Sequence, residues 1–128
     1  MPKVKIDIRR GRTGEEKQQI MDAIHDAMVE SIKIPKHDRL QILHEHDADQ
    51  FMIPEGKSER FTLVEISMYP GRSIETKRLL LKTIAKKLEE IGIQAHDTMV
   101  ILNEPPLDHW GVDGKPASEM QFGYRLDV

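Results

Sequence analysis

The sequence predicts an α/β chain of the α+β type, in which two tandem β-α-β units form a four-stranded sheet with two helices on one face. Two alternating, strand-like segments each run into a Gly-Arg-hydroxyl triplet, GRT at 11–13 and GRS at 71–73. Each triplet opens an amphipathic helical pattern that is followed by a second short apolar run. The stretches 11–45 and 71–104 align with one residue dropped, at an offset of about sixty residues. This parallel indicates a duplicated unit.

Length and composition favour one domain over residues 1–128, with repeat units 1–45 and 61–104 and a tail over 105–128. A chain of 128 residues can bury one substantial core. The net charge of −3 offers no basic field to a nucleic acid, and the absence of cysteine excludes disulfides and thiolate sites. No apolar run approaches the roughly 18 residues of a membrane span, and no signal-peptide core is present. We expect a cytoplasmic protein with neither nucleic acid nor membrane as a partner.

The first unit opens with KVKIDIRR over residues 3–10, whose strict alternation is typical of a half-buried strand. Thr13 stands at an N-cap position with Glu16 three residues on, which is the spacing of a capping box. Pro35 marks the end of the helix, and 40–43 is the predicted second strand. In a strand-helix-strand connection of this kind the two strands are parallel and the crossover is right-handed. The apolar stripe of the helix comprises Ile20, Ala23, Ile24, Ala27, Met28 and Ile32.

The second unit repeats this order with a strand over 61–68, a helix capped by Ser73 and ended at Gly92, and a strand over 99–102. The last strand reads MVIL without alternation, which is typical of a strand buried on both faces. The helix stripe comprises Leu80, Leu81, Ile84, Leu88 and Ile91.

Two helices can cover only one face of a four-stranded sheet. The remaining segments, the connection over 46–60 and the tail, are rich in loop residues. We therefore expect other copies of the chain to bury the second face in a homo-oligomer. The tail ends in a short alternating piece, predicted as a strand or hairpin that reaches a neighbouring subunit or closes the site.

Arg12 and Arg72 each stand at a strand-to-helix joint, immediately before a helix N-terminus. Free backbone N–H groups and the helix dipole favour an anion there, and the planar guanidinium matches a carboxylate. The alternative interpretation of each is a solvated arginine beside a helix cap. The repetition of the joint favours anion binding.

The chain starts with MPKVK, and removal of Met1 would leave Pro2 as a terminal secondary amine. Ordinary α-amino groups have pKa values near about 7.7–8.0. Desolvation and neighbouring arginine charges disfavour the protonated amine and so lower its pKa, which leaves a free base near neutral pH. Pro2 is therefore a candidate acid-base group, although many proteins carry the same start without using it.

His44 and His46 would share one face of a strand and could bind zinc together with a third ligand. A polar strand end is the simpler interpretation, and we expect no metal. The helix lysines Lys77, Lys82, Lys86 and Lys87 are typical of a solvated helix face.

Taken together, the Met-Pro start, the β-α-β units and the Gly-Arg-Ser/Thr joints resemble the tautomerase superfamily, as two fused 4-oxalocrotonate tautomerase units. The first half is most similar to the malonate semialdehyde decarboxylase-like branch, through HDAMVE at 25–30 and the segment 35–46. HWG at 109–111 is similar to the family's Trp/Phe-Gly segment. The resemblance covers essentially the whole chain and rests on the ordered set of motifs.

The resemblance implies a catalytic acid-base role for Pro2 and a supporting catalytic role for Asp38. It implies that Arg72 and Arg12 bind the substrate carboxylate and that Trp110 forms an apolar wall. Tyr69, beside Arg72 in sequence, either lines the pocket or merely packs. No cofactor is implied, and the expected assembly is a homotrimer with a site at each N-terminus.

The expected function is keto-enol tautomerisation of a small 2-oxo or 2-hydroxydienoic acid by a cofactor-independent isomerase. The decarboxylase branch carries two arginines around the second joint, whereas MYPGRS over 68–73 has one. The groups that position water in related dehalogenases have no evident match in MVILNEP over 99–105. The alternatives are a decarboxylase or hydratase of a small oxo acid such as malonate semialdehyde, and a non-catalytic carboxylate-binding oligomer.

Overall fold

The computed structural model describes residues 2–128. The first unit comprises β1 (Lys3–Arg9), α1 (Gly14–Ile32) and β2 (Leu40–His46), and the second comprises β3 (Thr62–Ser67), α2 (Ile74–Glu90) and β4 (Thr98–Asn103). The tail carries a small hairpin of β5 (Gly111–Val112) and β6 (Lys115–Pro116). Short 3₁₀ turns lie at η1 (Ala48–Gln50), η2 (Ala95–Asp97), η3 (Leu107–His109) and η4 (Ala117–Glu119).

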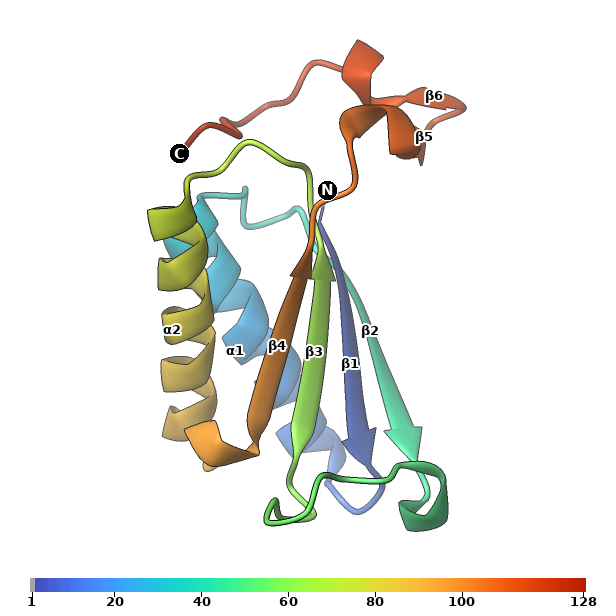
Figure 1. The fold of residues 1–128 in the computed structure, drawn as a ribbon, viewed down its shortest axis with the longest axis vertical. Helices are drawn as coiled ribbons and strands as arrows, with labels where there is room; N and C mark the ends of the chain where they lie inside the picture. Colours follow the sequence, from blue (N-terminus) through green and yellow to red (C-terminus); the bar gives the residue numbers. More distant parts are fainter. Residues whose placement is uncertain (1) are drawn as a thin grey trace.

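The four long strands form one mixed sheet in the order β2-β1-β3-β4. Each unit contributes a parallel pair, β1 with β2 and β3 with β4, and the two units meet through the antiparallel pair of β1 and β3. Both helices pack on the same face of this sheet (Figure 1). The predicted fold of two β-α-β units is therefore confirmed.

The two units repeat the same contacts at their helix starts. Each cap side chain accepts a hydrogen bond from the backbone N–H three residues on, Thr13 from Glu16 at 3.1 Å and Ser73 from Thr76 at 3.2 Å. A lysine in each helix donates to the glutamate near the end of its unit, Lys17 to Glu45 and Lys77 to Glu104, both at 2.8 Å. Both predicted N-caps are thus confirmed.

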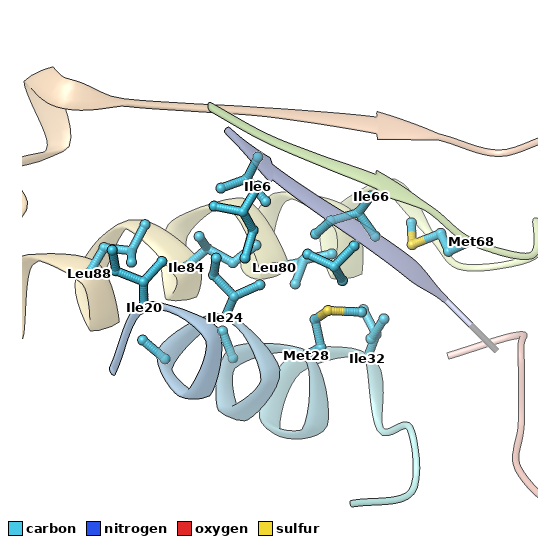
Figure 2. Close-up of a cluster of buried hydrophobic side chains, with 14 of the residues drawn as sticks. Ile6, Ile20, Ile24, Met28, Ile32, Ile66, Met68, Leu80, Ile84 and Leu88 are labelled. Atoms are coloured by element: carbon cyan, nitrogen blue, oxygen red, sulfur yellow. The ribbon is translucent and has the colours of Figure 1, made fainter. Parts of the chain in front are cut away.

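The hydrophobic core lies between the helices and the sheet (Figure 2). Ile6 and Ile66 come from the two central strands and are fully buried. The helices supply most of the predicted stripe residues, of which Ile20, Ile24, Met28, Ile32, Leu80, Ile84 and Leu88 are buried. The predicted helix stripes therefore face the sheet, with the exception of Leu81, which is 37% exposed on α2.

The last strand, β4, differs from the strand buried on both faces that the sequence predicted. In the single chain β4 alternates, because Val100 and Leu102 pack toward the core while Met99 and Ile101 remain 46% and 40% exposed. β2 is longer than predicted and runs to His46. Both helices lie on the other face, so nothing within residues 2–128 buries the outer side of β4. Within the same residues, no helix is long and apolar enough to cross a bilayer.

Candidate active site

The strand register gathers three predicted site residues at one end of the sheet, where β1 and β2 begin and β3 ends. The start of β1 pairs with the start of β2 and with the end of β3. Pro2, immediately before β1, is buried at this end. Asp38 lies two residues before β2, and Tyr69 lies two residues after β3. We call this end of the sheet the Pro2 edge; the name does not refer to the edge strands β2 and β4. In Figure 1 it is the upper end of the sheet, where the tail also lies.

A cavity of about 440 Å³ opens at the Pro2 edge. It lies between the segment that precedes β2, the residue Tyr69 and the tail. The predicted residues Asp38 and Tyr69 both line it. The remaining lining residues are Pro35, His37, Arg39, Val112, Met120, Gln121, Phe122, Gly123 and Tyr124.

Aromatic rings form one wall of this region. Tyr69 is 1% exposed, and its ring contacts Trp110 at a centroid distance of 4.7 Å in an edge-to-face arrangement. Phe122 lies 4.8 Å from Tyr69, and the Phe122 ring is 6.2 Å from that of Tyr124. The Trp110 Nε1 group donates to the Pro105 carbonyl at 3.0 Å, which orients the indole. Such a wall excludes water and strengthens electrostatic interactions behind it.

Arg72 is the buried cation of the Pro2 edge, and neither Arg72 nor Pro2 is among the residues that line the cavity. The residue is 5% exposed, and its Nη1 donates to the Tyr69 carbonyl at 3.2 Å. Its Nε and Nη2 groups are buried and have no hydrogen-bond partner within residues 2–128. Burial lowers the pKa of Arg72, and Tyr124 and Glu104 oppose that shift. Buried donors without partners are costly, so this guanidinium has spare capacity for an anion.

Tyr124 links the cation to the predicted carboxylate. Burial raises the pKa of Tyr124 to about 12, the charge of Asp38 adds to the shift, and the charge of Arg72 opposes it. A hydrogen bond to Asp38 also favours the protonated phenol. Burial and the Asp38 charge likewise raise the pKa of Tyr69. Asp38, Tyr124 and Arg72 therefore form one interacting set.

The end of the tail closes over the second Gly-Arg joint. The Ser73 backbone N–H donates to the Val128 carbonyl at 3.0 Å. The Leu126 carbonyl oxygen lies 3.1 Å from the point where a Cβ on Gly71 would stand. The tail thus covers the joint of its own chain, which agrees with the predicted closing role.

Arg12 lies at the opposite end of the sheet, so a single chain does not bring it to Pro2. Its Nη1 donates to Thr62 Oγ1 at 3.3 Å and its Nη2 to the Arg60 carbonyl. Burial lowers the pKa of Arg12, and the nearby charge of Arg60 adds to that shift. The predicted contribution of Arg12 to the Pro2 site remains a prediction, and it would require a second copy of the chain.

The two histidines considered as zinc ligands have other contacts. His46 Nε2 lies 2.6 Å from Asp7 Oδ1, and its ring stacks with His44 at 6.3 Å. No group of three or more His, Asp or Glu residues is placed to hold a metal ion within residues 2–128. The predicted removal of Met1 concerns a residue outside that range.

Sequence analysis missed Phe122 and Tyr124, which lie in the tail segment QFGYR over 121–125. A signal was available in the composition. The chain has one Trp, two Tyr and three Phe, and both tyrosines, the tryptophan and one phenylalanine gather at this edge. Scarce aromatics clustered in a loop-rich tail indicate a contact surface.

Comparison with known proteins identifies the family. Residues 38–113 match one family model described as tautomerase enzyme, and residues 2–60 match a second with the same description. The chain therefore belongs to the tautomerase superfamily, as the sequence motifs predicted. It is 30% identical to the probable tautomerase YrdN of Bacillus subtilis over 115 residues, 86% of this chain and 89% of that relative.

Two solved structures place the chain between branches of this superfamily. Malonate semialdehyde decarboxylase, described with decarboxylase and hydratase activities, has a TM-score of 0.79 and 30% identity, covering 84% of this chain and 88% of that one. A fused 4-OT solved as a symmetric trimer has a TM-score of 0.79 and 27% identity, covering 90% of this chain and 95% of that one. These two structures match this chain with the same TM-score.

Proposed function

We propose that this protein is a tautomerase that uses Pro2 as its acid-base group to interconvert the keto and enol forms of a small 2-oxo or 2-hydroxydienoic acid. One observation carries the proposal. Arg72 is buried at the Pro2 edge with two donor groups unpaired. A carboxylate is the chemistry that a buried, incompletely paired guanidinium recognises.

The proposed reaction needs one base and one anion clamp. The lone pair of the free Pro2 nitrogen takes the proton of the enol hydroxyl. The O–H electrons form the carbonyl, and the double-bond electrons shift toward a distal carbon of the conjugated acid. The protonated Pro2 then delivers its proton to that carbon, so the reaction needs no oxidant or reductant. Arg72 holds the carboxylate and stabilises the negative charge that develops on the conjugated system.

The remaining predicted residues shape the site in this proposal. Asp38 orients the polar end of the substrate or a water through its interaction with Tyr124. Tyr69 and Trp110 supply the apolar wall, which keeps water from weakening the Arg72 charge. Such acid-base catalysis contributes about 10²–10⁴-fold in rate.

A decarboxylase or hydratase is the second candidate, because the chain is 30% identical to malonate semialdehyde decarboxylase. In that reaction a protonated Pro2 would polarise the carbonyl of a β-oxo acid. A pH-rate profile separates the two functions. A tautomerase requires the free amine and loses activity as pH falls through the Pro2 pKa, whereas a decarboxylase of this type loses activity as pH rises through it.

The proposed assembly is a homotrimer. The fused 4-OT relative is a symmetric trimer, and the open outer face of the sheet exposes apolar residues on both edge strands, Leu40 and Ile42 on β2 and Met99 and Ile101 on β4. Burying these residues against other copies would remove an exposed apolar surface from water.

Substitution of Pro2 by alanine tests the function. We expect Pro2→Ala to lower kcat/KM for a 2-hydroxydienoic acid by about 10²-fold or more, because a primary amine replaces the ring nitrogen and its placement. Intact mass must first establish that Met1 is absent from the preparation, since a peptide bond at Pro2 removes the basic lone pair. Unchanged activity of a folded Pro2→Ala variant would exclude Pro2 as the catalyst.

A further inference from the structure

A second cavity, of about 250 Å³, lies at the end of the sheet opposite Pro2. We call it the arginine pocket. In Figure 1 this end is at the bottom, where β1 and β2 end and the connection over 46–60 crosses beneath the sheet. The charged residues that line it are Arg9, Arg10, Arg12, Arg60, Glu16 and Glu59.

The arginine pocket is cationic although the whole chain is not. Four guanidinium groups and two carboxylates line it, whereas the chain carries a net charge of −3. A concave surface with an excess of one charge focuses the field and attracts counter-ions. The local charge therefore favours an anion.

Two of the arginines are held in place by neutral partners. Arg9 donates through Nε and Nη2 to the Phe51 carbonyl at 3.1 and 2.9 Å. Arg12 donates to Thr62 Oγ1 and to the Arg60 carbonyl. These contacts orient the guanidinium groups without neutralising them. A pre-oriented cation binds an anion with less loss of side-chain entropy.

The other two arginines, Arg10 and Arg60, each have an acidic partner, but the two ion pairs differ in distance and strength. Arg10 donates to Asp47 at 2.9 Å, so its charge is compensated. Arg60 Nη1 lies 3.8 Å from Glu16 Oε2, and both side chains are about 40% exposed, so this pair is weak. Burial lowers the pKa of Arg12, and the nearby charge of Arg60 lowers it further. An anion placed between Arg12 and Arg60 would relieve that repulsion.

The arginine pocket lacks an acid-base group corresponding to Pro2. Phe61 immediately precedes β3, as Pro2 immediately precedes β1, and Phe61 is buried. No residue of its lining supplies a free amine or imidazole. The chemistry available there is binding rather than proton transfer.

We propose that the arginine pocket is a second, non-catalytic binding site for a small dianion, such as a short dicarboxylate or a phosphate group. Arg9 and Arg12 have no ion pair among residues 2–128, and Arg60 has only the weak 3.8 Å contact with Glu16, so these three guanidinium groups match more than one negative charge. Glu16 and Glu59 also line the pocket and reduce its net positive charge. Within one chain this site lies at the end of the sheet opposite Pro2, and it does not depend on the proposed reaction.

Isothermal titration calorimetry on the intact protein tests this site with succinate, inorganic phosphate and propionate. We expect at least one dianion to bind, and propionate to bind at least about tenfold more weakly, because it offers one charge to a multiply cationic site. Binding should weaken as salt concentration rises. The absence of binding of both dianions at millimolar concentration, or equal affinity for propionate, would overturn the proposal.

Matched charge-removing variants locate the site. We expect Arg9→Gln and Arg60→Gln each to raise the Kd for the dianion about tenfold or more, while Arg78→Gln, an exposed arginine on α2, leaves it unchanged. Circular dichroism checks that each variant is folded. Arg72→Gln and Pro2→Ala should retain binding. If Arg72→Gln abolishes binding while Arg9→Gln and Arg60→Gln do not, the dianion binds the Pro2 edge and the arginine pocket is not a site.

Discussion

The Tyr124 hydroxyl stands between the buried cation and the predicted carboxylate. Its pKa of about 12 keeps the phenol protonated throughout the neutral range, so it donates toward Asp38 while interacting with Arg72. The Arg72 guanidinium donates to the Tyr69 carbonyl and also interacts with Tyr124 through a side-chain hydrogen bond. Tyr124 is therefore the side chain best placed to set where the Arg72 guanidinium points.

Tyr124→Phe should raise KM for the substrate acid about fivefold to tenfold with a smaller change in kcat. The reason is that loss of one hydrogen bond to a charged group weakens carboxylate binding more than proton transfer. Because the phenol does not ionise below its pKa of about 12, the ratio of wild-type to variant kcat/KM should stay constant from about pH 6 to 9.

Arg125→Gln provides the control for this experiment. Arg125 lies on the same tail but is exposed, and among residues 2–128 its side chain pairs with Asp127 alone, so its loss should leave KM unchanged. A ratio that varies steeply with pH, or an equal loss in both variants, would contradict the positioning role of Tyr124.

The family resemblance pointed to Asp38, and the second Gly-Arg joint pointed to Arg72 and its neighbour Tyr69. Asp38 and Tyr69 line the cavity, because the strand register carries both to the Pro2 edge, and the catalytic or binding role of each residue stays a prediction. Phe122 and Tyr124 belong to the alternating end of the tail, but alternation alone does not say which part of the molecule the tail folds over. Sequence similarity was misleading for Arg12. Its Gly-Arg joint looks the same in sequence as that of Arg72, but it lies at the other end of the sheet.

The two Gly-Arg joints differ as elements in what surrounds them. Gly11 and Gly71 have nearly the same φ, 134° and 131°, a region that favours glycine. A Cβ at Gly11 would have nothing within 4 Å, whereas one at Gly71 would meet the Leu126 backbone at 3.1 Å. The second joint is therefore coupled to the tail and the first is not.

Gly71→Ala should reduce activity, and Gly11→Ala should not. Both variants carry the same backbone strain, of order 1–3 kcal/mol, and should lower Tm, Gly71→Ala by more because its Cβ also meets the Leu126 backbone. Only Gly71→Ala displaces the tail that closes over Arg72. Thermal unfolding and kcat/KM measured on both variants separate strain from site damage. Equal activity in the two folded variants would show that the tail has no part in catalysis.

Asp97 ties the connection over 46–60 to the start of β4. It accepts from the Ser58 backbone N–H at 2.9 Å and from Ser58 Oγ at 2.6 Å. These side-chain and backbone hydrogen bonds lower the pKa of Asp97 below its ordinary value. Stability from this carboxylate is thus fully present above the unfolded pKa of about 3.9 and is lost as pH falls through the lower folded value.

Asp97→Asn should destabilise the protein by about 1–2 kcal/mol at neutral pH and by less as pH falls through the folded pKa of Asp97, because the wild-type carboxylate then loses its charge as well. Denaturant unfolding at several pH values measures this change. Asp127→Asn is a control, since Asp127 is exposed and its side chain pairs with Arg125 on the tail. A destabilisation by Asp97→Asn that does not depend on pH would contradict the proposed role of the charge.

Elements with a local start signal were predicted well from the sequence. Thr13 and Ser73 cap their helices, and Gly92 follows the end of α2, as expected. The alternation of β4 was not predicted, because MVIL contains no polar residue to reveal which side faces outward. The predicted strand or hairpin of the tail forms at β5 and β6, and not in the alternating end of the tail, where residues 121–128 form no strand. Two-residue strands have almost no sequence pattern of their own.

Residues 2–128 leave one face of the sheet without cover. The strand register aligns Ile42 of β2, Lys5 of β1, Glu65 of β3 and Ile101 of β4 in one row across the sheet. Ile42 and Ile101 are each 40% exposed, at the two ends of this row. Apolar edges around a charged centre suit a surface that meets copies of itself, because each edge strand can bury its isoleucine against a neighbour.

Ile42→Glu should therefore dissociate the proposed trimer, because it places a charge in an apolar contact that recurs at each interface by symmetry. Sedimentation velocity or light scattering measures the mass directly. Leu79→Glu is the matched control, since Leu79 is 51% exposed on α2, and the helices lie on the other side of the sheet. A trimer that survives Ile42→Glu but dissociates in Leu79→Glu would place the interface on the helices, and the outer face of the sheet would then need another partner.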